Sequence, residues 1–276
     1  MELGLNGATT LKADLATDIA VAGTAGFDFV EIWAAKLMGY LEWGGLPALK
    51  RDLKRSGVKA FTLNSVERVT FNDPSGHIRM LEDFQRFCRV AEAIGAETII
   101  VVPSPRPKGL GPRAIEQESV KVLRELSKIA EPYGLKLAYE FLGFPDCTVN
   151  SLAQCAAIVR KVARENVGFV LDTFHFFAGG STVASIAEVD PRKIFVVHVN
   201  DVERAPRRKM HDALRLFPGK GIIPLVRILE NLRAIGYTGK FSVEIFRPEY
   251  WNRPPLAVAR EARRTTLAAL HQAGFC

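Results

Sequence analysis

Eight short runs of aliphatic and β-branched residues recur along this chain of 276 residues, and a longer amphipathic stretch follows each of them. This alternation is the signature of repeated βα units, whose strands pair in parallel. Within residues 83–94 and 116–131, apolar residues recur at every third or fourth position, which predicts helices. The predicted strands span residues 3–6, 29–33, 59–64, 98–102, 136–140, 168–172, 195–199 and 241–245.

Glycines mark the same point in several of these units. Each follows a predicted helix and precedes a strand, as expected for a helix that ends in left-handed geometry. They are Gly26, Gly57, Gly95, Gly134 and Gly236. The chain length is close to the roughly 250 residues of a typical (β/α)₈ barrel. The first strand is not followed by a GxGxxG motif, which argues against an open dinucleotide-binding sheet. We therefore predict an α/β fold, a single (β/α)₈ TIM barrel, as one domain over residues 1–276.

Cysteine usage and hydropathy indicate the compartment. The cysteines at 88, 147, 155 and 276 form neither a CxxC pair nor a closely spaced framework, which argues against a zinc knuckle or a disulfide scaffold. No basic segment followed by an apolar one opens the chain, and no apolar run approaches about 18 residues. We expect a soluble cytoplasmic protein with no membrane contact.

The formal net charge of +7 comes mostly from short groups of Lys and Arg on predicted helices. We interpret these groups as solvated helix faces. The exception is the segment 204–209, Arg-Ala-Pro-Arg-Arg-Lys, which its proline places in a loop.

Four predicted strand ends carry metal-ligand side chains, at the place where (β/α)₈ barrels hold their active sites. They are Glu140, Asp172, His198 and Glu244. Because side chains alternate along a strand, these four share their inward face with small or apolar residues two positions earlier, which a barrel interior accepts. Those earlier residues are Ala138, Val170, Val196 and Ser242, whereas Leu137 and Tyr139 should face the helices.

Three carboxylates and one imidazole form a mixed oxygen and nitrogen site that suits Zn, Mn, Co or Mg. Carboxylates brought together in a partly desolvated mouth repel one another unless a cation compensates them. The alternative, in which each acid caps a helix or pairs with a surface arginine, is reasonable for one acid and poor for the whole set. We therefore predict one bound divalent metal ion.

Three further polar residues are candidates for substrate contact. His175 follows Asp172 by three residues and could reach a substrate oxygen beside the metal, or could pack between its phenylalanine neighbours; we favour the functional interpretation. Asn6 and Asn64 end the first and third predicted strands. Each amide could bind a ligand hydroxyl or bridge strand to loop, and the sequence leaves both open.

Six stretches carry a resemblance that extends over nearly the whole chain. They are NGATT (6–10), AEPY (130–133), CTVN (147–150), NVGFVLDTFHF (166–176), RLFPGKG (215–221) and SVEIFRPEY (242–250). Through them the chain resembles the xylose-isomerase-like barrel superfamily of sugar isomerases and epimerases, and within it the inosose isomerases of inositol catabolism. The resemblance places the family's metal ligands on the same four strand-end residues and its substrate-binding histidine on His175.

Three features depart from the isomerase pattern. Gly7 stands where those isomerases tend to carry an acid, and the loop 202–213 is far more basic. Arg204 resembles the substrate-binding arginine of ketose 3-epimerases, so we predict that it contacts substrate together with His175, Asn6 and Asn64.

The superfamily also contains apurinic endonucleases of the endonuclease IV type, whose three-metal site needs additional histidines. The third and fourth strand ends carry Asn64-Ser65 and Pro103-Ser104 instead, and the expected Asp-x-His reads Ala213-Leu214-Arg215. We therefore expect no specific nucleic-acid partner.

The resemblance implies isomerisation of a small polyhydroxy ketone, most specifically an inosose. The metal would act as a Lewis acid and stabilise a cis-enediolate, with Glu140 and Glu244 as the acid/base pair, and a hydride shift is the mechanistic alternative. Competing predictions are a ketose 3-epimerase, indicated by Arg204 and Asp146, an inosose dehydratase, and a barrel that binds sugar or metal without turnover. Since barrels of this superfamily commonly pair, a homodimer is also possible.

Overall fold

The eight predicted strands close into a parallel barrel in a computed structural model that describes residues 1–275, so Cys276 lies outside the described residues. Around the barrel the strands are β1 (Glu2–Asn6), β10 (Lys240–Val243), β7 (Ile194–Val199), β6 (Val167–Asp172), β5 (Lys136–Glu140), β4 (Thr98–Val101), β3 (Lys59–Val66) and β2 (Phe29–Trp33). The predicted TIM barrel is therefore confirmed.

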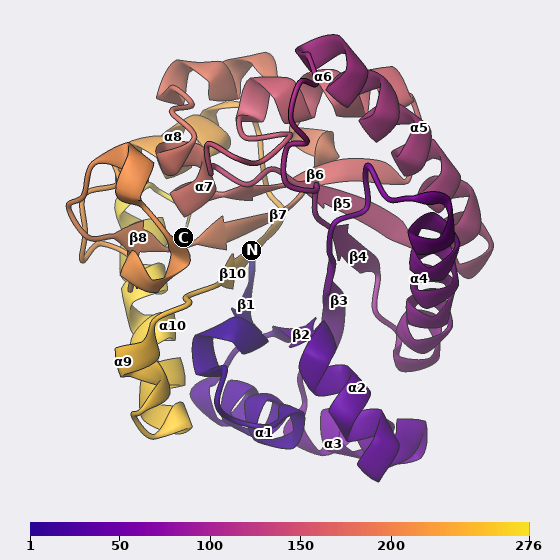
Figure 1. The fold of residues 1–276 in the computed structure, drawn as a ribbon. Coiled ribbons are helices and arrows are strands. Elements are labelled where there is room, and N and C mark those ends of the chain that lie inside the picture. The colour runs from indigo at the N-terminus through magenta and orange to yellow at the C-terminus, as the bar shows by residue number, and fades with distance from the viewer. Residues whose placement is uncertain (276) are drawn as a thin grey trace.

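Helices surround the barrel on its outside (Figure 1). They are α1 (Leu15–Ala25), α2 (Ala34–Trp43), α3 (Gly45–Ser56), α4 (Pro74–Ile94), α5 (Pro112–Ala130), α6 (Leu152–Val162), α7 (Thr173–Ala178), α8 (Leu225–Ala234), α9 (Pro248–Trp251) and α10 (Pro255–Gln272). The five predicted cap glycines all have positive φ, between 66° and 84°. In the described residues no helix is both long and apolar enough to span a membrane.

The apolar core has two layers, as the strand alternation predicts. The inner layer fills the barrel and consists of Phe29, Phe61, Ile100, Val102, Ala138, Val170 and Val196. Leu137 and Tyr139 belong to the outer layer, between strands and helices. Burying each large side chain contributes roughly 1.5–3 kcal/mol, so the filled interior is a rigid platform for the strand ends above it.

Some strand ends differ from the prediction by one or two residues, and one difference positions the site. β10 ends at Val243 rather than at residue 245. The Thr9 hydroxyl donates to the Val243 carbonyl (2.9 Å) and accepts from the Ile245 amide (3.1 Å), so it replaces the sheet's hydrogen bonds there. Glu244 thus lies just beyond the strand, held from both sides by this hydroxyl.

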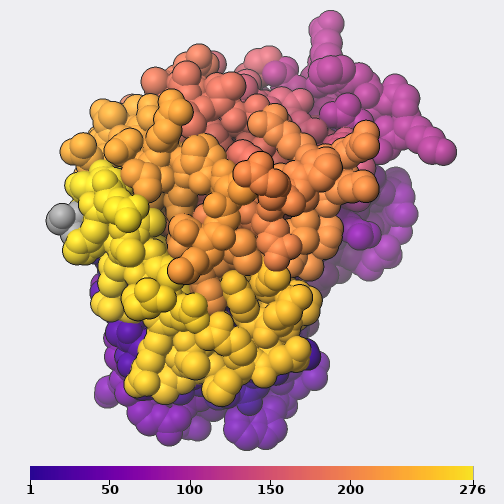
Figure 2. All heavy atoms as spheres, turned by 90° about the vertical axis from the view of Figure 1, so that its left-hand side faces the viewer, coloured from indigo at the N-terminus to yellow at the C-terminus, as the bar shows by residue number. Residues whose placement is uncertain are grey.

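A two-stranded antiparallel ribbon follows β7. It pairs β8 (Asp201–Val202) with β9 (Arg215–Leu216). The loop 203–214 between them, coloured orange in Figure 1, lies at the molecular surface, as Figure 2 shows. The ribbon brings the end of that loop back to the carboxyl ends of the barrel strands.

Candidate metal centre

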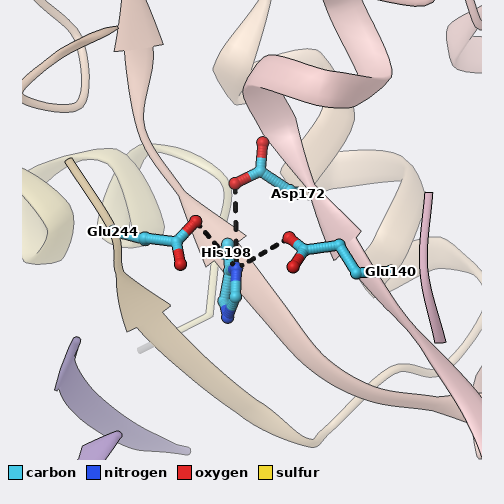
Figure 3. A group of neighbouring side chains, drawn as sticks. All are labelled: Glu140, Asp172, His198 and Glu244. Atoms are coloured by element: carbon cyan, nitrogen blue, oxygen red, sulfur yellow. Dashed lines mark hydrogen bonds and ion pairs between the residues drawn. The ribbon is translucent and has the colours of Figure 1, made fainter. Parts of the chain in front are cut away.

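The structure brings the four predicted ligands together into one group, which we call the four-ligand cluster: Glu140, Asp172, His198 and Glu244. They come from β5, β6, β7 and the end of β10, which are consecutive around the barrel. Figure 3 shows the three carboxylates pointing toward the His198 ring from different sides. From His198 Nδ1 the nearest oxygens of Glu140, Glu244 and Asp172 are at 3.1, 3.3 and 3.8 Å.

These separations fit a cation. Bonds of about 2.0–2.2 Å to nitrogen and oxygen in a tetrahedral site place the ligand atoms roughly 3.3–3.6 Å from one another. All four donor atoms of the cluster lie within 4.8 Å of one another and are buried. Small side-chain movements therefore suffice to bring these donors around one divalent ion, and their oxygen and nitrogen chemistry suits Zn, Mn, Co or Mg.

The ionisation of the cluster shows what a cation would compensate. Burial raises the pKa of Glu140 to about 7 although His198 opposes the shift. Burial also penalises the charged form of Asp172, but Arg215, the two histidines and the His175 backbone amide together outweigh it and lower the pKa of Asp172 to about 2. Burial disfavours a charged His198, yet Glu244, Glu31 and Glu140 raise its pKa well above the usual value. In the metal-free protein a proton on His198 thus compensates the negative charge of the acids, which a bound metal ion would otherwise compensate.

Asp172 serves two structures at once. Its Oδ1 accepts a hydrogen bond from the His175 backbone amide (2.8 Å) as the N-cap of α7, whereas Oδ2 accepts from Asn200 and Arg215 and faces the cluster. Helix capping is the alternative to metal binding that the sequence allows for each of these acids, and Oδ1 of Asp172 does cap α7. The cap fixes the carboxylate, and it also begins the short helix that carries His175.

Arg215 is a site residue that the sequence analysis missed. Its side chain is 1 % exposed, and its Nη1 lies 2.7 Å from Asp172 and 3.1 Å from Glu244. Nη2 lies 3.0 Å from His175 Nε2. The signal that could have found it is its place at the start of the RLFPGKG stretch, where the endonuclease comparison expected a histidine.

His175 packs and points into the site. Gly143 allows the loop after β5 to approach it, since a Cβ at Gly143 would lie 2.4 Å from the His175 carbonyl oxygen. The Gly143 amide lies 3.2 Å from Nδ1. A neutral imidazole has one proton, so it accepts a hydrogen bond from only one of Gly143 and Arg215. Burial, with Arg215 adding to it against the pull of Asp172, lowers the pKa of His175.

A cavity of about 350 Å³ opens directly above the cluster. Glu140, Glu244, His175 and Arg215 lie in its wall, while Asp172 and His198 lie beneath the surface. The aromatic rings of Trp33, Phe144 and Phe246 also line it. A polyol-sized ligand in this cavity would therefore meet the two predicted acid/base carboxylates.

The predicted substrate contacts fall in different places. Asn64 lines the cavity and donates to Glu244 (2.9 Å). Asn6 is fully buried beneath it, with its amide shared between Glu31 (3.2 Å) and Glu244 (3.0 Å). Arg204 is exposed and does not line the cavity. Contacts of these residues with a substrate stay predictions.

Comparison with known proteins agrees with this geometry. A model of the family described as xylose isomerase-like TIM barrel matches residues 19–269. Inosose isomerase of Bacillus licheniformis is 38 % identical over 97 % of both chains. A crystal structure of the IOLI protein with a binding zinc atom superimposes with a TM-score of 0.95, at 37 % identity and over 98 % of both chains. D-psicose 3-epimerase of Ruminiclostridium cellulolyticum is 29 % identical over 47 % of this chain and 41 % of that protein.

Proposed function

Because this chain belongs to the xylose isomerase-like TIM barrel family, we propose that it is a divalent-metal-dependent isomerase of an inosose, a cyclic polyhydroxy ketone. The full-length similarity to inosose isomerase supports this substrate. The zinc atom of the similar IOLI structure supports zinc as the ion. When bound, such an ion supplies Lewis-acid polarisation of a substrate carbonyl.

The observation that carries the proposal is the position of two carboxylates in the cavity wall. Glu140 and Glu244 approach His198 from opposite sides (Figure 3), and both line the cavity. Isomerisation through an enediol moves a proton off one carbon and onto its neighbour, which requires a base and an acid within reach. Among the described residues Glu140 is hydrogen-bonded only by the His198 side chain, so it is the less restrained of the two carboxyls.

The surrounding residues orient the substrate. Arg215 and His175 lie beside the acids in the wall and are placed to hold substrate oxygens that gain negative charge. The aromatic side chains Trp33 and Phe246, whose ring centroids are 5.3 Å apart, offer an apolar surface to the C–H face of a cyclic polyol.

Incubation of zinc-loaded protein with scyllo-inosose in deuterium oxide tests the proposal. We expect metal-dependent deuterium incorporation next to the carbonyl and the appearance of a second keto-inositol in NMR spectra. Product without deuterium would indicate a hydride shift. No product and no exchange would contradict the isomerase.

A ketose 3-epimerase is the second candidate, and Asp146 favours it because this acid lines the same cavity. D-fructose and D-psicose incubated under the same conditions separate the two candidates. Exchange with these ketoses and none with scyllo-inosose would support the epimerase.

The remaining proposals concern setting and assembly. We propose that residues 1–276 act as one domain on a small molecule, without a specific nucleic-acid partner, and that a homodimer forms. Cys88, Cys147 and Cys155 are free and buried, which supports action in the reducing cytoplasm.

A further inference from the structure

A fourth buried acid, Glu31, lies inside the barrel below the four-ligand cluster. It is in the middle of β2 and is 1 % exposed, and it is not part of the cavity wall. Glu31 therefore cannot touch a substrate in the cavity. Its role has to act through its neighbours.

Polar groups surround the Glu31 carboxylate, and the Ser242 hydroxyl is one of them. The Thr62 hydroxyl donates to Oε2 (2.7 Å), and the Asn6 amide donates to Oε1 (3.2 Å). His198 Nε2 lies 3.1 Å from Oε1. In the part of the chain that the structure describes, no lysine or arginine pairs with this acid.

A merely structural role explains this acid poorly. Removing a carboxylate from water costs several kcal/mol unless cationic or strong hydrogen-bonding partners compensate it. At this position, among the apolar side chains that fill the barrel, an aliphatic residue would avoid that cost. The one partner of Glu31 in the described part of the chain that can carry charge is His198, so the acid is best explained by what it does to that ring.

We propose that Glu31 is a positioning residue of the metal centre, which holds the proton of His198 on Nε2 and thereby presents Nδ1 to the ion. A neutral imidazole carries its proton on one nitrogen only. Nδ1 is the nitrogen that faces the three carboxylates of the cluster, at 3.1 to 3.8 Å. An acid beside Nε2 keeps the proton there and makes Nδ1 a more basic ligand.

The position of Nε2 supports this role. This nitrogen is buried, and among the described residues no group accepts an aligned hydrogen bond from it. Within residues 1–275 its one contact of opposite charge is Glu31 Oε1, at 3.1 Å but outside hydrogen-bond alignment. Glu31 is therefore the acceptor available to that proton.

Asn6 connects this acid to the cluster. The same Nδ2 donates to Glu31 Oε1 and to Glu244 Oε1, at 3.2 and 3.0 Å. One amide thus orients two acids on different sides of the imidazole: Glu244, a candidate ligand, and Glu31, beside Nε2. The inference rests on the metal centre of the proposed function and is independent of its substrate.

Zinc affinity of the purified full-length protein, measured by competition with a chromophoric chelator, tests the role. Glu31→Gln should weaken zinc binding about 10- to 100-fold, as the loss of such supporting groups does in metal sites. The melting temperature without metal should fall modestly, because Glu31 and a protonated His198 compensate each other in the metal-free protein. In ¹H–¹⁵N spectra of zinc-loaded protein with labelled histidine, the His198 Nε2–H resonance should move in this variant.

Thr98→Val is the matched control. Thr98 is another buried polar side chain of the barrel strands, and its hydroxyl has no partner in the described residues. It should leave zinc affinity unchanged. If Glu31→Gln does not fold, Thr62→Val replaces it, since this change removes only the hydrogen bond to Oε2 and should weaken zinc binding a few-fold.

Wild-type zinc affinity in the Glu31 variant, or in Thr62→Val where that is used, would overturn the positioning role. An equal loss in Thr98→Val would overturn it too, because the effect would then belong to the barrel as a whole. A wild-type protein that binds zinc but does not convert inosose would remove the proposed function and leave this inference standing.

Discussion

The two carboxylates in the cavity wall are held very differently. Glu244 accepts hydrogen bonds from Asn6 and Asn64 on Oε1, and its Oε2 lies 3.1 Å from Arg215 Nη1. Among the described residues Glu140 is hydrogen-bonded only by His198, and burial raises its pKa to about 7. The difference divides the pair that the sequence analysis treated as equals. The donors keep Glu244 in place, while Glu140, with one hydrogen-bonding neighbour among the described residues, is the less restrained carboxylate.

Replacement of Glu140 should have the largest effect. Glu140→Gln should lower kcat on the inosose about 10²- to 10⁴-fold, the usual contribution of a general acid or base. Zinc affinity should fall far less, because the other three ligands remain. Solvent-deuterium exchange followed by NMR measures the loss.

Glu67→Gln is the control for that variant, because Glu67 is another acid of the cavity wall but is not a member of the cluster. It should retain kcat within a few-fold. Near-normal exchange in Glu140→Gln would reverse the comparison and make Glu244 the proton carrier.

The position of Glu244 should depend on Arg215. Arg215→Met leaves Asp172 and Glu244 without their guanidinium, and breaking a buried ion pair on one side costs about 3 kcal/mol. We expect that loss in urea unfolding of the metal-free protein, and a smaller one for Arg215→Lys, which keeps the charge. A loss below 0.5 kcal/mol in both variants would show that Glu244 is held without Arg215.

The pH dependence of stability should separate the metal-free from the metal-loaded protein. Because the folded-state pKa of Glu140 is raised from 4.5 to about 7, its ionisation destabilises the fold as pH rises between these two values and adds little above the second. The raised pKa of His198 stabilises the fold below the unfolded value and loses that effect as pH rises through the folded one. The lowered pKa of His175 acts in the opposite direction, but only below its unfolded value of 6.5.

From pH 6.5 to 9 the metal-free protein should therefore lose melting temperature, on the order of 5 °C. Zinc should flatten this dependence, since the ion replaces the proton in balancing the acids. Asp18, whose pKa burial also raises to about 7, contributes equally to both forms and cancels in their difference. Calorimetric curves that run parallel with and without zinc would contradict the assignment of these shifts to the cluster.

The sequence predicts what repeats and misses what does not. The barrel and the four ligands follow from a strand pattern in which each ligand stands at the same point of its unit. Arg215 reaches the site only because β8 and β9 pair and fold the loop 203–214 back, and no periodicity encodes that pairing. Glu31 stands in an apolar strand whose register with β3 shifts between Val30 and Glu31, so alternation alone does not give its direction.

The smallest effect should come from the arginine that the resemblance suggested. Arg204 is exposed and lies outside the cavity wall, whereas Arg215 is buried within it. An exposed side chain without buried partners usually contributes less than about 0.5 kcal/mol, so Arg204→Ala should change KM by less than about twofold. Arg215→Lys should raise KM more, because a lysine cannot reproduce the paired donors of a guanidinium. Steady-state kinetics of the two variants at saturating zinc measure this, and a larger rise in KM for Arg204→Ala would show that the loop 203–214 closes over the bound substrate.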